Sequence, residues 1–112
     1  MAGIFASFAG GTVAVPNPID FTARVATVVT SGTAIQLPSV VVPDGIMVVI
    51  RATASNKNKK IYLSNSSANV ADATKRLILA AGESIGLQVA DTNVVWIDSD
   101  SNNASIEFFV EQ

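Results

Sequence analysis

The loop near the C-terminal end carries the residues best suited to metal chemistry. Asp98, Asp100 and Asn102 alternate at the spacing with which an oxygen-ligand calcium loop begins. A helix–loop–helix calcium site would continue with Gly and place a carboxylate at its twelfth position, where this chain has Asn103 and Phe109. The pattern therefore favours a solvated hairpin loop whose Asp, Asn and Ser side chains cap local backbone donors. A looser calcium site in a loop between strands is the alternative.

The chain contains no His and no Cys, which restricts the catalytic chemistry open to it. Ser-His-Asp catalysis, cysteine nucleophiles, thiolate zinc sites and disulfides are all excluded within the chain. A glycosidase would need two facing carboxylates in a cleft, and the nine carboxylates here fall mostly at predicted turns. A domain of this size rarely forms such a cleft. We therefore expect no enzyme activity, no cofactor and no metal, with a small carboxylate hydrolase as a formal alternative.

The only basic cluster is formed by Lys57, Lys59 and Lys60. A nucleic-acid site would need aromatic side chains interleaved with these lysines as stacking platforms, and only Tyr62 is near. The formal net charge of −2 also gives no electrostatic basis for binding nucleic acid. We expect a solvated hairpin tip, with contact to an acidic partner surface as the alternative.

Tyr62 and Trp96 are the aromatic residues that could form a sugar-stacking patch. Together with the loop from Asp98 to Asn103 they suggest a carbohydrate-binding module as one alternative function. Trp96, however, lies in an apolar strand, which favours a place in the core or in an interface.

The composition is unusually poor in charge. Of the 112 residues, 49% are hydrophobic and 14% are charged, whereas about a quarter of residues are charged in ordinary soluble domains. Such a surface is tolerated when neighbouring proteins cover much of it; a compact domain with an uncharged polar surface is equally compatible. No stretch approaches the ~20 apolar residues of a membrane span, so we expect no membrane contact.

Short apolar segments with a period of two, separated by dense turn signals, predict seven or eight strands. The expected strands are 21–30, 33–37, 45–54, 61–63, 76–79, 84–89, 94–97 and 104–111. The proline-bracketed segment 38–43 is expected to be an edge strand or an extended connection. A single helical turn is an option at 68–73. This spacing predicts an all-β fold, a single antiparallel β-sandwich of the jelly-roll or Greek-key kind, over residues 19–112.

The segment 1–18 differs from the rest of the chain. Its apolar residues are separated from the first strand by Gly10-Gly11 and by a stretch that contains Pro16 and Pro18. This arrangement indicates an extended N-terminal arm that docks on a neighbouring subunit, with docking on its own domain as the alternative. The predicted interface residues of the arm are Ile4, Phe5, Phe8, Val13 and Val15.

Four segments occur in an order that resembles a recurrent small virion domain of tailed bacteriophages. They are GIMVVIRA from Gly45, NKKIYLS from Asn58, LAAGES from Leu79 and VVWI from Val94. Together they cover about half of the chain. The family has Gly where this chain has Ser64, a mild departure that does not affect the likeness.

Members of this family are capsid decoration (cement) proteins or modules of fibres and other virion attachments. The resemblance implies a β-sandwich without enzymatic activity that binds a lattice of major capsid protein, often as a trimer. We therefore expect a structural virion protein that binds and stabilises the capsid, with the major capsid protein or another virion protein as its partner. Its expected location is the virion, assembled in the host cytoplasm. A tail, neck, baseplate or fibre component is the alternative.

Overall fold

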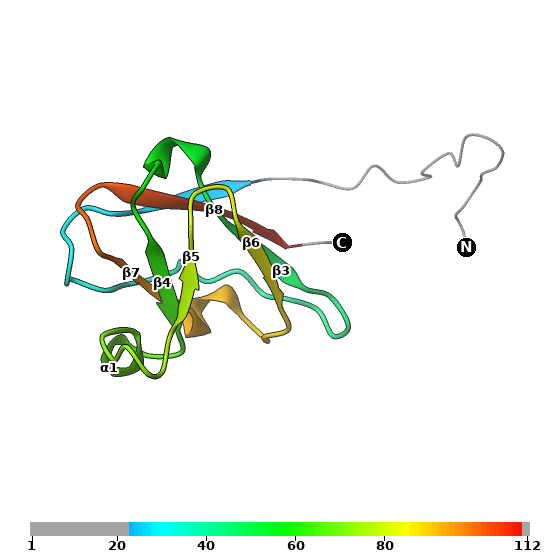
Figure 1. Cartoon of the computed structure of the whole chain (residues 1–112). Coiled ribbons are helices and arrows are strands. Elements are labelled where there is room, and N and C mark those ends of the chain that lie inside the picture. The colour runs from blue at the N-terminus through cyan, green and yellow to red at the C-terminus, as the bar shows by residue number, and fades with distance from the viewer. Residues whose placement is uncertain (1–22, 111–112) are drawn as a thin grey trace, which may run out of the picture.

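The structure is a computed structural model, and it describes residues 23–110 (Figure 1). Within this range the chain forms eight strands, one short α-helix and two single 3-10 turns. The strands are β1 (Arg24–Val28), β2 (Ile35–Gln36), β3 (Val48–Ala52), β4 (Ile61–Ser64), β5 (Leu77–Leu79), β6 (Ser84–Leu87), β7 (Trp96–Ser99) and β8 (Ala104–Val110). The helix is α1 (Ser67–Val70), and the 3-10 turns are η1 (Ala54–Asn56) and η2 (Thr92–Val94).

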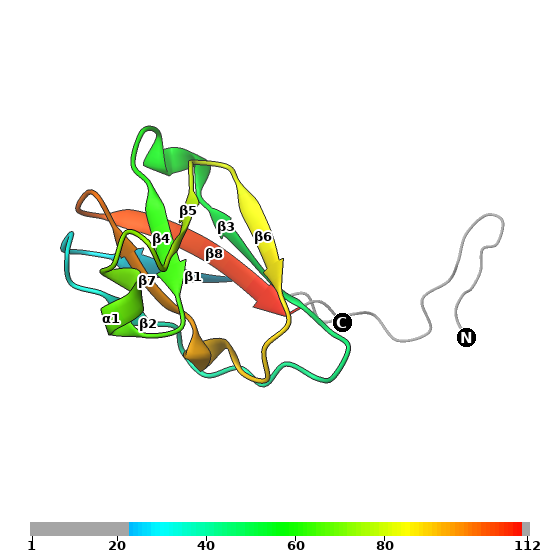
Figure 2. The same cartoon turned by 60° about the horizontal axis from the view of Figure 1, so that its bottom comes forward.

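The strands form two antiparallel sheets of four strands each (Figure 2). The first sheet has the order β1-β8-β3-β6 and the second sheet has the order β2-β7-β4-β5. Pairing links the first strand to the last, the second to the seventh, the third to the sixth and the fourth to the fifth. The predicted all-β class and the expected number of strands are confirmed for the described residues.

Both sheets contribute to one hydrophobic core. The alternation predicted for the segment around β3 is confirmed, because Val48, Ile50 and Ala52 are fully buried while Arg51 between them is exposed. The largest fully buried side chains of the core are Phe108, Leu37, Ile50, Ile61, Leu63 and Ile97. Burial of such side chains contributes ~1.5–3 kcal/mol each and is the main favourable term in folding. The two inner faces therefore hold the sheets together.

Most predicted elements differ in their bounds from those in the structure: β1, β2, β3 and β6 are shorter than predicted, and β7 begins at Trp96 and not at Val94. The physical reason is visible at β3 and at the helical turn. β3 begins at Val48 and not at Gly45, because Gly45 lies in a turn with φ +78° that Ile46 closes by donating its N–H to the Pro43 carbonyl at 3.0 Å. The helical turn begins earlier than predicted, since the Ser66 hydroxyl accepts the Asn69 N–H at 3.1 Å and caps α1.

The proline-bracketed segment is an extended connection, as predicted. It pairs with the chain before η2 through a single bridge between Val41 and Asp91, and the Val42 N–H donates to the Ala90 carbonyl at 2.9 Å. Val42 is buried in the core. The segment therefore closes one side of the molecule without forming a longer strand.

Candidate functional site: an apolar groove between β5 and β6

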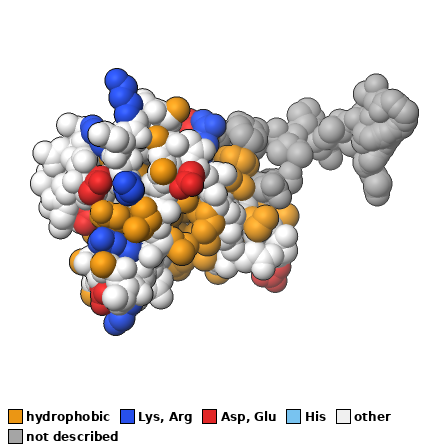
Figure 3. Space-filling model, viewed as in Figure 1, with side chains coloured by type: hydrophobic (Ala, Val, Ile, Leu, Met, Phe, Trp, Pro, Cys, Tyr) orange, Lys and Arg blue, Asp and Glu red, His pale blue; other side chains and the backbone are white. Residues whose placement is uncertain are grey.

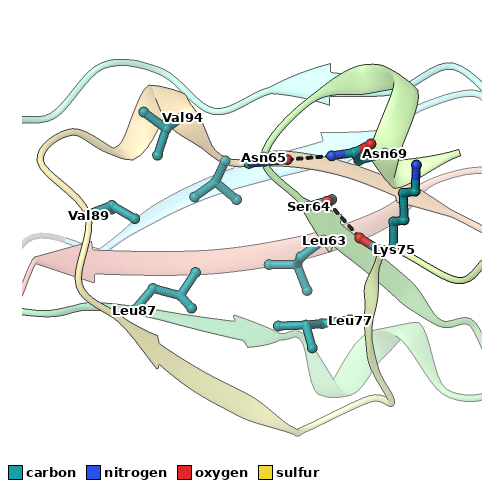
Figure 4. Close-up of a pocket in the computed structure, with 10 residues that line it drawn as sticks. Leu63, Ser64, Asn65, Asn69, Lys75, Leu77, Leu87, Val89 and Val94 are labelled. Atoms are coloured by element: carbon teal, nitrogen blue, oxygen red, sulfur yellow. Dashed lines mark hydrogen bonds between the residues drawn. The ribbon is translucent and has the colours of Figure 1, made fainter. Parts of the chain in front are cut away.

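The described residues form an open groove of about 460 Å³ between the two sheets, where β5 and β6 are the edge strands (Figure 4). Six apolar side chains line it: Leu63, Leu77, Leu87, Val89, Val94 and Val95. Ser64, Asn65, Asn69 and Lys75 complete the lining. A concave apolar surface with a few polar groups at its rim is the usual form of a binding site.

The groove exists because the two edge strands belong to different sheets. Leu77 lies opposite Leu63 in the β4–β5 pair, and Leu87 lies opposite the fully buried Val48 in the β3–β6 pair. Side chains directly opposite each other in a pair share one face of the sheet. Leu77 and Leu87 therefore both point into the space between the sheets, and no further described strand covers them from the side.

The turn from Ala80 to Glu83 fixes the distance between the two edge strands. Gly82 has φ +85°, a conformation that favours glycine, and its N–H donates to the Ala52 carbonyl at 2.8 Å. The Glu83 carboxylate accepts the Ala80 N–H at 2.7 Å, and the Glu83 carbonyl accepts the Ala52 N–H at 2.9 Å. The two bonds to Ala52 join the turn to β3, and the bond between Ala80 and Glu83 stabilises the turn itself. The turn thereby holds β5 and β6 in place at one end of the groove.

The polar rim makes internal hydrogen bonds. The Ser64 hydroxyl donates to the Lys75 carbonyl at 2.8 Å, and the Asn69 side-chain amide donates to the Asn65 side-chain oxygen at 2.8 Å. Lys75 is the only charged residue in the lining. Asp72, 3.9 Å from the Lys75 ammonium, has its pKa lowered chiefly by the hydrogen bond from the Thr74 hydroxyl. The groove is thus nearly free of charge.

Large apolar side chains are exposed around the groove. Leu77 is 49% exposed, Ile78 50% and Val94 41%. Figure 3 shows hydrophobic side chains gathered on the face that carries β5 and β6, with charged side chains around them. Contiguous exposed apolar surface of this kind marks interaction sites.

The sequence did not single out these residues. One signal was present, because Leu77, Ile78 and Leu79 are three consecutive large apolar residues in a short strand. Period two buries only every second residue against one core, so such a run leaves apolar side chains on both faces. These additional apolar side chains line a groove only because both sheets end at this place, with β5 and β6 as their edge strands.

The five predicted interface residues Ile4, Phe5, Phe8, Val13 and Val15 lie outside the described residues, as does the predicted arm over residues 1–18. The predicted domain 19–112 contains the described range.

The loop predicted to be solvated lies at the other end of the strands from the groove. Asp98 and Ser99 are 5% and 2% exposed and belong to β7, so the prediction of a solvated loop is wrong for these two residues. The β1–β2 connection folds over them, and the Asp98 carboxylate accepts the Gly32 N–H at 3.0 Å.

Asp100, Asn102 and Asn103 of that loop are exposed, and Ser101 is half-buried. Asp100 and Asn102 do accept hydrogen bonds from backbone donors, but these donors lie in segments distant in the sequence, whereas the prediction was of local donors. Asn102 accepts the Ser31 N–H at 2.8 Å, and Asp100 accepts the Lys60 N–H at 2.9 Å. The latter bond is the main reason why the pKa of Asp100 is lowered. Within residues 23–110, no group of three or more acidic side chains is placed to hold a metal ion.

The lysine cluster lies beside this loop. Lys57 and Lys60 are exposed, and the Lys59 ammonium donates to the Asn102 carbonyl at 3.0 Å. Lys57 has φ 59° at the end of η1. These residues therefore form a tip that is bonded to the neighbouring loop.

Tyr62 and Trp96 both lie on the outer face of the second sheet and are half-buried, so the core position considered for Trp96 is wrong. The Arg76 guanidinium carbon lies 3.6 Å from the centre of the Tyr62 ring, and the Arg76 side chain also donates to the Val70 carbonyl at 3.2 Å. α1 packs on β4 and β7 through the fully buried Val70. One face of the Tyr62 ring is thus occupied by an intramolecular cation–π contact.

No family model matches the sequence, and comparisons with curated proteins and with solved structures gave no significant match. Among the described residues, no helix has the length and apolar character that crossing a membrane requires.

Proposed function

We propose that this protein is a structural virion protein that binds and stabilises a phage capsid, as decoration or cement proteins do, and that it is not an enzyme. The observation that carries the proposal is the open, nearly uncharged apolar groove between β5 and β6. Half-exposed Leu77 and Ile78 on an edge strand suit contact with another polypeptide chain. We infer that the groove is where this chain meets another protein chain of the particle.

We further infer that the fold is a jelly-roll β-sandwich. The support is the pairing of each strand with its counterpart from the other end of the chain, first with eighth through fourth with fifth. A long hairpin rolled around a core gives this order, and jelly rolls recur in viral capsid and lectin domains. Because a fold hosts many functions, this support is by analogy, and the groove carries the greater weight.

Assembly on a symmetric lattice accounts for a small interaction surface. Copies joined through the groove into a closed oligomer bind a repeating lattice with a gain from avidity, even where each copy makes only a small contact with the lattice. A homotrimer is the oligomer that we propose, with major capsid protein as the lattice.

Co-sedimentation tests this function and separates it from a role in the tail. Purified full-length protein is mixed separately with capsids and with tails from a phage that encodes it, each prepared without the protein. We expect it to pellet with capsids in a saturable amount. Pelleting with tails alone would support a tail, neck, baseplate or fibre component in its place. Pelleting with neither particle would overturn both.

A further inference from the structure

The proposed function does not specify which protein chain binds in the groove. We propose that it binds the N-terminal segment of a second copy of this chain, with Phe8 entering between Leu77 and Leu87. This inference rests on the proposed role in assembly and names the partner of the same site. In the homo-oligomer, the N-terminal segment of one copy is then the donor and the groove between β5 and β6 of the next copy is the acceptor.

The acceptor suits an extended peptide. β5 pairs on one side with β4 and is the edge of the second sheet, so an added strand has access to its other side. Leu77 faces the groove and Ile78 faces outward, and each is about half exposed. A segment laid along β5 covers both side chains at once, because its own side chains alternate between the same two faces.

The N-terminal segment has the matching chemistry. Residues 2–19 contain no ionisable side chain, so the segment enters an apolar groove without removing a charge from water. In an extended conformation Ile4, Ala6 and Phe8 share one face, which gives an apolar row for the groove. Lys75 is the only charged residue in the lining, and its ammonium already has the Asp72 carboxylate at 3.9 Å. The groove therefore does not require a charged residue from the segment that it binds.

Ala23 lies at the edge of the first sheet opposite to the groove of its own chain, which suits donation to a second copy. Ala23 lines a hollow on the outer face of the first sheet, together with Val49 and Phe109. It precedes β1, which is the edge of that sheet opposite to β6, so two strands separate the chain's point of departure from the groove. The fifteen residues from Phe8 to Ala23 span at most about 50 Å when extended, which is enough to reach an adjacent molecule. Such a donor–acceptor contact is heterologous and forms a ring when its rotation closes.

Disulfide trapping tests the contact, and the native chain contains no Cys to interfere. Full-length Phe8→Cys and Leu77→Cys chains with tags of different mass are mixed, oxidised mildly and run on a non-reducing gel. We expect a mixed disulfide dimer. The matched control pairs Phe8→Cys with Val29→Cys, because Val29 is an apolar residue of similar exposure, 64%, after β1 and away from the groove. The control pair is expected to give at least tenfold less mixed dimer.

Two results would overturn the proposal. One is a mixed dimer no more abundant than in the control, with thermal melts showing that Leu77→Cys remains folded. The other is a chain carrying both Phe8→Cys and Leu77→Cys that forms only an internal disulfide, since the groove would then hold its own segment. The experiment contains no capsids, so its failure leaves capsid co-sedimentation intact, and failure of co-sedimentation leaves the trapped dimer intact.

Discussion

Leu77 lies directly opposite Leu63 in the pairing of β5 with β4, yet Leu63 is 2% exposed and Leu77 is 49% exposed. Both side chains face the space between the sheets. The difference arises because β7 flanks Leu63 on the other side, whereas β5 is the edge of its sheet. The change from a buried leucine in β4 to a half-exposed leucine in β5 marks the groove to which we assign the function.

The same strand provides a matched test of burial. Leu79→Ala should lower the free energy of unfolding by about 2–5 kcal/mol, because Leu79 is 6% exposed and its removal leaves a cavity in the core. Leu77→Ala should cost about 1 kcal/mol or less, since half of that side chain is already in water. Urea denaturation followed by circular dichroism measures both. Equal losses would contradict the open groove.

Thr92 is a fully buried polar residue that joins two connections. Its hydroxyl donates to the Pro38 carbonyl and accepts the Val40 N–H at 2.9 Å. Thr92→Val should destabilise the domain by about 0.5–1.5 kcal/mol, because it removes the Thr92 hydroxyl from two part-buried hydrogen bonds, while the Val40 N–H keeps the Asp91 carboxylate at 3.1 Å.

Thr92→Ser is the control for that prediction, as it keeps the hydroxyl and removes only a methyl group. It should cost less than Thr92→Val in the same denaturation experiment. The reverse order would show that packing of the methyl group, and not the hydrogen bonds, makes Thr92 important.

Asp91 makes stability depend on pH. Its pKa is lowered first by the hydrogen bond from the Asn93 N–H, then by the bond from the Ser39 hydroxyl. A carboxylate whose pKa is lower in the folded state stabilises the protein above its unfolded pKa of ~3.9, and this contribution is lost as pH falls through the folded pKa.

The urea midpoint of the native protein should therefore decrease as the pH falls from 5 to 2.5, and the decrease should be smaller in Asp91→Asn. Asp72 and Asp100, whose pKa values are also lowered, will leave part of the decrease in the variant. Identical decreases in both proteins would show that the Asp91 hydrogen bonds do not stabilise the fold.

Much of the fold could be predicted from the sequence because its strands follow period two. Val48, Ile50 and Ala52 in β3, and Ile106 and Phe108 in β8, are buried at every second position, as a period of two requires. Local patterns determine which face of a strand is apolar, and that was sufficient for the class and the approximate strand positions.

The features that could not be predicted depend on what covers each face. Asp98 was expected in a solvated loop, but the β1–β2 connection buries it and supplies a backbone donor. Val70 is buried because α1 folds onto the outer face of the second sheet, a contact that no periodicity encodes. The groove at Leu77 arises for the converse reason, since its sheet ends there. Coverage is set by tertiary structure and not by the local pattern.

The central claim is that the groove between β5 and β6 mediates assembly of the particle. The most direct test is the occupancy of capsids by full-length Leu77→Asp, compared with Val29→Asp, measured by quantitative sedimentation with thermal melts to verify folding. A charge at half-exposed Leu77 should reduce occupancy at least tenfold, whereas a charge at Val29 should leave it unchanged. Undiminished occupancy by folded Leu77→Asp would contradict the claim.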